Sequence, residues 1–202
     1  AGTGKTWTII SRVADLIKTG EKTSSIVLLT FTRKAAYEMK GRLKKIIGEK
    51  SKGVFAGTFH GFCMSIMRKY PNYFPIKSHT VIDRDDQLQL MKLCKAKNIK
   101  KGQKFLMPSQ LVNIFSYAKN TNISPKKYLN KYKDSLELDN KKIDLCIKIF
   151  KSYQDRKHIL KYLDYDDILH LFASTIHKNE KFQKKIRSTY KHILVDEMQD
   201  TN

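Results

Sequence analysis

The chain opens with Ala1-Gly2-Thr3-Gly4-Lys5-Thr6, which runs directly into an amphipathic segment ending near Lys18. Glycines permit left-handed backbone torsions and a close approach to phosphate. The amides at a helix N-terminus point at an anion, with the helix dipole behind them. Lys5 can reach the outer phosphates of a nucleotide, and the Thr6 hydroxyl can bind Mg²⁺. We interpret this stretch as the second half of a phosphate-binding loop.

The complete loop pattern contains a further glycine five residues before Gly4, a position that precedes Ala1. We therefore expect the strand that leads into the loop to be missing as well. A glycine-rich terminal tail is the alternative interpretation, because half a motif is weak evidence when taken alone.

The other end of the chain carries two acids after a short apolar run, His192-Ile193-Leu194-Val195-Asp196-Glu197. In nucleotide hydrolases the first acid at such a strand end holds Mg²⁺, and the second polarises the attacking water. An acidic turn after a buried strand is the alternative. Together the two ends predict a nucleotide hydrolase in which Lys5 and the two acids meet at one Mg-nucleotide cleft.

Composition narrows the class of protein. The 202 residues are 41% hydrophobic and 29% charged, which is typical of a globular chain with one domain and a sizeable insertion. There is no apolar run of membrane-spanning length and no signal peptide pattern, so we expect a soluble protein with no membrane partner. Cys63, Cys94 and Cys146 are too scattered for a disulfide framework or a zinc site and indicate the reducing cytoplasm.

The formal net charge is +21, from 40 basic and 19 acidic residues, and it favours a polyanionic partner. Most of these basic residues are lysines, and a merely solvated lysine-rich surface is the alternative.

Strand and helix patterns alternate in the first third of the chain. Strands are predicted at Ile26–Thr30 and Val54–Ala56, and helices run from the following turns to about Ile47 and Tyr70. Ligands of parallel α/β sheets bind at the carboxyl ends of the strands. The two Thr-Phe turns that follow these strands should therefore share an edge with the phosphate loop.

The alternation then stops, and more than a hundred residues between Ala56 and Ile193 show no clear strand. Helices are predicted to begin near Asp85, Pro108, Pro125 and Asp139, which indicates an inserted helical unit. Residues 84–161 hold 19 basic and 7 acidic residues, a surplus of 12. We expect an α/β domain made of residues 1–82 and 163–202, with a basic helical insert at 83–162. Asp164 is expected to cap the next helix rather than to act in catalysis.

Five motifs, in order, resemble those of the UvrD/Rep/PcrA helicases of superfamily 1. They are Ala1–Thr6, Thr30-Phe31-Thr32-Arg33-Lys34-Ala35-Ala36-Tyr37-Glu38-Met39, Gly57-Thr58-Phe59-His60-Gly61, Leu163-Asp164-Tyr165-Asp166-Asp167 and Val195-Asp196-Glu197-Met198-Gln199-Asp200-Thr201-Asn202. The resemblance implies the first RecA-like P-loop NTPase domain with a large all-α insertion. It also implies ATP-driven 3′ to 5′ translocation on single-stranded DNA with unwinding of duplex DNA. The second RecA-like domain of the same protein is an implied partner.

The resemblance assigns roles by matching position. Ala1, Gly2, Thr3, Gly4, Lys5 and Thr6 would bind ATP; Thr6 and Asp196 would hold Mg²⁺; Glu197 would activate water, with Gln199 sensing the γ-phosphate; and Phe31, Thr32, Arg33, Thr58, Phe59 and His60 would contact DNA. Aromatic stacking supports a base by ~1–3 kcal/mol regardless of sequence, and hydroxyls and amides at helix starts suit phosphates. Core packing is the alternative for the two phenylalanines, and bracing of the turn is the alternative for the histidine. Arg33 and Met198 replace a common Asn and a common aromatic residue of the family.

Three other readings stay open. The motor could belong to a helicase-nuclease of the AddA or RecB sort, which sequence beyond Asn202 would decide. A basic helical module that only binds nucleic acid is the second. The third is an ATP-dependent switch that does not move along a nucleic acid, for which binding of polynucleotides would show little salt dependence.

Overall fold

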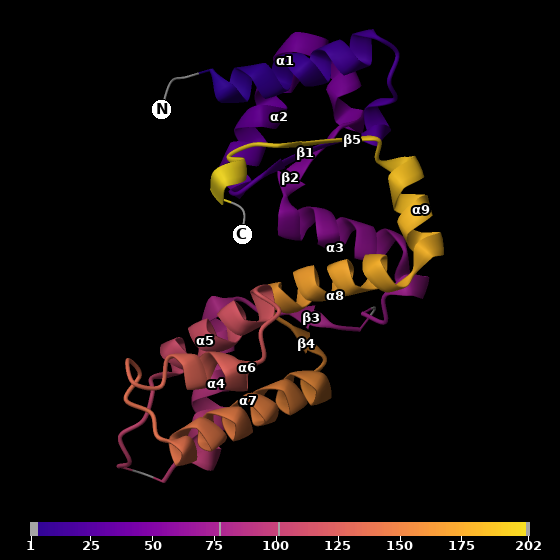
Figure 1. Cartoon of the computed structure of the whole chain (residues 1–202). Helices are drawn as coiled ribbons and strands as arrows, with labels where there is room; N and C mark the ends of the chain where they lie inside the picture. Colours follow the sequence, from indigo (N-terminus) through magenta and orange to yellow (C-terminus); the bar gives the residue numbers. More distant parts are fainter. Residues whose placement is uncertain (1–3, 77, 101, 201–202) are drawn as a thin grey trace. The chain divides into compact units, whose positions relative to one another are not determined.

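The computed structural model describes residues 4–76, 78–100 and 102–200 (Figure 1). The chain divides into two compact units: residues 1–75 with 171–202 form the first unit, and residues 76–170 form the second. The predicted insert, 83–162, lies within the second unit, which also includes a short segment on either side of it. Across the described residues, no helix combines the length and the apolarity needed to cross a bilayer.

The first unit contains a three-stranded sheet in which both pairings are parallel and the strand order is β2-β1-β5. The strands are β1 (Ile26–Thr30), β2 (Phe55–Thr58) and β5 (His192–Val195). Leu29 pairs with Gly57 on one side and with Val195 on the other, so the carboxyl ends of all three strands lie at one edge. The predicted α/β class is confirmed.

The predicted bounds of the second strand, Val54–Ala56, are wrong. Val54 still belongs to the turn before the strand, where its N–H donates to the Ser51 carbonyl at 3.1 Å. The ladder with β1 then continues through Gly57 and Thr58. The apolar pattern stops at Ala56 because Gly57 has no side chain and Thr58 already caps the helix that follows.

Helices cover both faces of the sheet, with α1 and α2 on one side of it and α3 on the other (Figure 1). The helices of this unit are α1 (Lys5–Lys18), α2 (Arg33–Ile47), α3 (Phe59–Lys69), the C-terminal part of α8 (Tyr165–Lys178) and α9 (Glu180–Thr189); the short 3-10 turns are η1 (Thr23–Ser25), η2 (Gly48–Gly53), η3 (Pro71–Tyr73) and η4 (Met198–Asp200). Ile26 and Leu28 pack with the apolar stripes of α1 and α2. Val27 and Leu29 are also buried and alternate to the other face. A strand covered on both sides reads as a continuous apolar run, which is why β1 is evident in the sequence.

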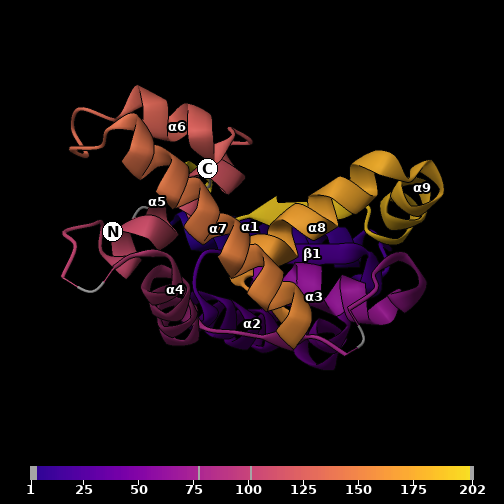
Figure 2. The ribbon, with the colours of Figure 1, turned by 90° about the horizontal axis from the view of Figure 1, so that it is seen from below.

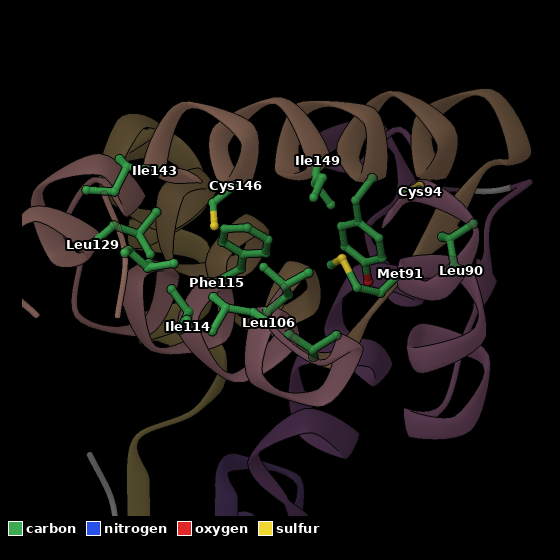
Figure 3. Packing of buried hydrophobic residues seen from close by; sticks show 14 of the residues in the cluster. Leu90, Met91, Cys94, Leu106, Ile114, Phe115, Leu129, Ile143, Cys146 and Ile149 are labelled. Atoms are coloured by element: carbon green, nitrogen blue, oxygen red, sulfur yellow. The ribbon is translucent and has the colours of Figure 1, made fainter. Parts of the chain in front are cut away.

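The second unit is helical and its core is shown in Figure 3. Its elements are β3 (Thr80–Val81), α4 (Arg84–Asn98), α5 (Pro108–Asn120), α6 (Pro125–Lys131), α7 (Asn140–Leu160), β4 (Tyr162–Leu163) and the first turns of α8. Ile143, Cys146 and Ile149 point from α7 toward Phe115, whose ring stacks on that of Phe150 with centroids 4.0 Å apart. The predicted helices of the insert are confirmed.

The expectation that no strand lies between Ala56 and Ile193 is wrong. β3 and β4 form a parallel pair, and the Thr80 and Ile82 N–H groups donate to the carbonyls of Lys161 and Leu163 at 2.9 Å. Each strand has only two residues. A pattern of alternating residues needs a longer run than this to be visible in a sequence.

Candidate functional site

The three segments that follow β1, β2 and β5 lie at the carboxyl edge of the sheet. Thr30 at the end of β1 pairs with Thr58 at the end of β2. The Asp196 N–H donates to the Leu29 carbonyl at 2.9 Å, which extends the ladder one residue beyond β5. Figure 2 gives a second view of these elements, from below. Predicted site residues from three distant parts of the chain therefore lie along one edge of one sheet.

The start of α1 faces the segment after β5. Gly4 occupies the N-cap position of α1 with a φ of 73°, a left-handed conformation that favours glycine. Lys5 is the first residue of the helix, and its Nζ lies 3.3 Å from Oε2 of Glu197, 192 positions further along the chain. Thr6, next to it, is half-buried. The predicted loop residues Ala1, Gly2 and Thr3 lie outside the described residues.

The two acids after β5 have different environments. Asp196 is 6% exposed. The Glu197 side chain is 40% exposed and accepts hydrogen bonds from Gln199 and Lys5. The Gln199 hydrogen bond, followed by the hydrogen bond and charge of Lys5, holds the pKa of Glu197 below its usual value. Glu197 is therefore ionised at neutral pH, and its side chain is more accessible to solvent than that of Asp196.

The turn after β1 presents an aromatic ring. The Thr30 hydroxyl donates to the carbonyl of Thr32 and accepts from its N–H, both at 3.2 Å, which fixes the turn between them. The Thr32 hydroxyl caps α2 by accepting from the Ala35 N–H at 3.1 Å. Phe31 lies between these two threonines and is 64% exposed, so core packing does not account for it. Arg33, the first residue of α2, is also exposed.

A separate turn after β2 was expected, and that expectation is wrong, because β2 ends at Thr58 and α3 begins at Phe59. Thr58 is both the last strand residue and the helix cap, and its hydroxyl accepts from the Gly61 N–H at 3.1 Å. A Cβ at Gly61 would lie 3.3 Å from that hydroxyl oxygen, so glycine leaves room for the cap. Phe59 and His60 are half-buried in the first turn of α3.

A buried ionic cluster in the second unit was not predicted. Lys157 donates to both Asp164 and Asp167, and the lysine side chain is 3% exposed. Tyr153 donates to Asp164 at 3.0 Å, and Lys119 pairs with Asp167. Burial by itself raises the pKa of Asp167, but the two lysines outweigh it and hold this pKa below its usual value.

The expected capping role of Asp164 is confirmed within this cluster. Its side chain accepts from the Asp167 N–H at 2.8 Å, and the Asp167 side chain accepts from the Asp164 N–H at 2.9 Å. The sequence does hold a signal for the cluster: Lys157 lies four residues after Tyr153, on the continuation of the buried stripe of α7. A lysine on such a stripe needs a buried partner.

A lysine at a helix start that contacts an acid just after a parallel strand is typical of phosphate-binding α/β proteins. A family model described as the UvrD/REP helicase N-terminal domain matches residues 1–202. The chain belongs to this family, as the five motifs predicted.

Several curated relatives match the whole chain, among them three DNA helicases from different bacteria. The chain is 32% identical over 205 residues to the ATP-dependent DNA helicase Rep of Buchnera aphidicola subsp. Schizaphis graminum, of which it covers 30%. It is 30% identical over 206 residues to the ATP-dependent DNA helicase UvrD1 of Mycobacterium tuberculosis, covering 26% of it. It is 31% identical over 209 residues to the ATP-dependent DNA helicase PcrA of Staphylococcus epidermidis, covering 27% of it. The chain therefore spans less than a third of each of these relatives.

Proposed function

We propose that this chain is the nucleotide-binding and DNA-binding N-terminal part of an ATP-dependent DNA helicase, which moves 3′ to 5′ on single-stranded DNA and unwinds duplex. The contact between Lys5 and Glu197 carries the proposal, because it brings a phosphate-binding lysine to a water-activating acid across 192 positions. The relatives named above are ATP-dependent DNA helicases. We assign residues 1–82 and 163–202 to a RecA-like ATPase domain and residues 83–162 to its helical insert.

In this proposal the triphosphate of ATP lies against the start of α1. Gly4 has the left-handed torsion that lets a backbone approach phosphate, and Ala1, Gly2 and Thr3 would complete the loop. The Lys5 ammonium is exposed enough to reach the outer phosphates. The terminal phosphate would lie between Lys5 and Glu197.

The residues present fit a Mg²⁺ ion that is shared with the nucleotide. Thr6 and Asp196 offer hard oxygen ligands, and the hydrogen bond from the Asp196 N–H to the Leu29 carbonyl holds this acid at the carboxyl edge of the sheet. Among the described residues no group of three or more His, Cys, Asp or Glu forms a self-contained metal site. Mg²⁺ typically takes one or two protein ligands together with phosphate oxygens and waters. When bound, it would neutralise charge on the phosphates.

Hydrolysis would then use the segment after β5. Glu197 is ionised at neutral pH because its pKa is lowered, so it can accept a hydrogen bond from the attacking water and orient it. Gln199 donates to the same carboxylate and would report the state of the γ-phosphate to the DNA-binding turns. Lys5 would stabilise the negative charge on the phosphate oxygens.

Single-stranded DNA would run along the carboxyl edge of the sheet. The exposed ring of Phe31 can stack on a base, and Arg33 can pair with a phosphate. The capping hydroxyls of Thr32 and Thr58 each accept from an N–H, which leaves the hydroxyl proton free to be donated to a phosphate. Phe59 and His60 would complete this contact from α3.

The three cysteines of the chain are free, and we place the protein in the cytoplasm.

The test compares Lys5→Met with Lys18→Met, which removes the same charge from the other end of α1. We expect Lys5→Met to abolish ATP binding measured by calorimetry on the chain, and DNA-stimulated ATP hydrolysis in the whole protein, while Lys18→Met leaves both intact. Equal behaviour of the two variants would contradict the proposal. We expect negligible ATP turnover by the 202-residue chain alone, because phosphoryl transfer depends on an arginine worth about 10³-fold or more that the resemblance places in the second RecA-like domain.

A further inference from the structure

Three tyrosines of the second unit form a continuous aromatic group where α5 packs against α6. The ring centroids of Tyr117 and Tyr128 are 5.1 Å apart, and those of Tyr128 and Tyr132 are 4.6 Å apart. Tyr117 is 48% exposed, and the other two rings are half-buried. Tyr128 packs against the apolar core of the second unit, and Tyr117 is the ring of the group that presents most aromatic surface to solvent.

The position of these rings is set by the packing of α6. Leu129 is 0% exposed and fixes this short helix to the apolar core of the second unit. Tyr128 of α6 lies next to Tyr117 of α5, and Tyr132, which caps the C-terminus of α6 four residues later, contacts Tyr128. The rings are thus held in place before any ligand arrives.

Exposed lysines flank Tyr128 and Tyr132 along the chain. We call the following residues the tyrosine–lysine surface: Tyr117, Tyr128, Tyr132, Lys126, Lys127, Lys131 and Lys133. The Lys131 Nζ lies 5.3 Å from the ring centroid of Tyr132. Lys126 pairs with Asp144 at 3.6 Å, but both side chains are well exposed and such a pair contributes little. Within the described residues, Lys127, Lys131 and Lys133 have no carboxylate at ion-pair distance.

We propose that the tyrosine–lysine surface binds single-stranded DNA as a second contact, separate from the edge of the sheet. Unpaired ammonium groups neutralise backbone phosphates, and exposed rings stack on bases or sugars of any sequence. A duplex keeps its base faces covered, so the rings favour a single strand over a duplex. This inference rests on the proposed function and adds a DNA contact in the insert.

The first experiment tests how much the lysine charges of this surface contribute to DNA binding. The Lys127→Gln/Lys131→Gln double variant is compared with Lys92→Gln/Lys97→Gln, which removes two exposed lysines from α4. Binding of fluorescent oligo-dT to the 202-residue chain is followed by anisotropy over a range of salt concentrations. We expect the surface variant to bind roughly tenfold more weakly at low salt, with a salt slope lower by about 1.4, because each single-strand phosphate contact contributes about 0.7. An equal loss in the α4 variant overturns the inference.

The second experiment tests whether the Tyr117 ring stacks on the bases of single-stranded DNA. Tyr117→Leu keeps an apolar side chain but removes the ring, and we expect about fivefold weaker oligo-dT binding with unchanged duplex binding. Ultraviolet crosslinking of a bromodeoxyuridine oligonucleotide should label the peptides that contain Tyr117 or Tyr132. If Tyr117→Leu has no effect while the lysine variant weakens single-strand and duplex binding equally, the single-strand assignment is wrong.

Phe31→Ala separates this inference from the proposed function. Loss of DNA binding in Phe31→Ala, with none in the surface variants, overturns the tyrosine–lysine surface and leaves the sheet edge as the DNA site. Loss in the surface variants with none in Phe31→Ala supports the surface and counts against the sheet edge. Thermal unfolding of each variant checks that the second unit still folds.

Discussion

Two lysine–carboxylate contacts, one in each unit, differ in how far solvent reaches them. The Lys5 and Glu197 side chains are 59% and 40% exposed, whereas those of Lys157 and Asp164 are 3% and 7% exposed. The first pair lies at the edge of a parallel sheet, where ligands of such folds bind. The second pair is enclosed by helices. The exposed pair, Lys5 and Glu197, is accessible to a ligand, whereas the buried pair, Lys157 and Asp164, can only stabilise the fold.

The physical environments explain this difference. In the second unit, Lys157 has two carboxylate partners, and Asp164 additionally accepts from Tyr153 and from the Asp167 N–H. A buried charge is tolerated only when its hydrogen-bonding capacity is met in this way. Solvent screens the contact between Lys5 and Glu197, so breaking it costs the fold little.

The largest effect is expected from Lys157→Met. The substitution leaves Asp164 buried without its cation and Asp167 with only Lys119, so the free energy of unfolding should fall by about 3–5 kcal/mol. Urea unfolding followed by circular dichroism measures this loss. Lys151→Met, at an exposed position of the same helix, should change it by less than about 0.5 kcal/mol. A similar loss of unfolding free energy in both variants would show that the cluster does not stabilise the second unit.

Acid should weaken the same cluster. The folded-state pKa of Asp167 is held below the ordinary value of 3.8, so its contribution to stability is present above about pH 3.8 and is lost as the pH falls through the folded-state pKa. Urea unfolding between pH 7 and pH 2 should show this loss, and it should be smaller in Asp167→Asn. Asp134→Asn, which removes an exposed carboxyl group, is the control and should keep the wild-type pH dependence.

A smaller effect is expected at the two threonine caps of the sheet edge. Thr32→Ala and Thr58→Ala should each lower the free energy of unfolding by about 1 kcal/mol, because a backbone N–H of the helix loses its acceptor. Thr→Ser at the same positions keeps the hydroxyl and should recover most of that loss. DNA affinity measured on the serine variants then separates a contact to DNA from an effect on the fold.

The smallest change in stability is expected from Lys5→Met, the same substitution as in Lys157→Met. Its unfolding midpoint should equal that of the wild type, because the lysine is exposed and its contact is screened. Differential scanning fluorimetry on the two variants compares the units directly. A large loss of stability in Lys5→Met would show that the contact with Glu197 is structural.

Much of the first unit was predictable because its signals are local. The continuous apolar run of β1 indicates a strand covered on both faces, and Gly48 ends α2 with a φ of 60°, which glycine adopts without strain. The β3–β4 pair was not predictable, because two-residue strands have no period and form only when Thr80 meets Tyr162 across 82 positions. The buried cluster was missed for a related reason, since the charge on Lys157 suggested an exposed side chain.

The sequence by itself determined the family, the order of the longer strands and helices and the residue types of the candidate nucleotide site, because motifs and apolar periods consist of residues close together in the chain. Only the tertiary structure decided which charges are accessible. The contact of Lys5 with Glu197 and the burial of Lys157 between two aspartates depend on how segments distant in the chain pack together. Burial then determines the free-energy cost of a charge and whether that charge can bind a ligand.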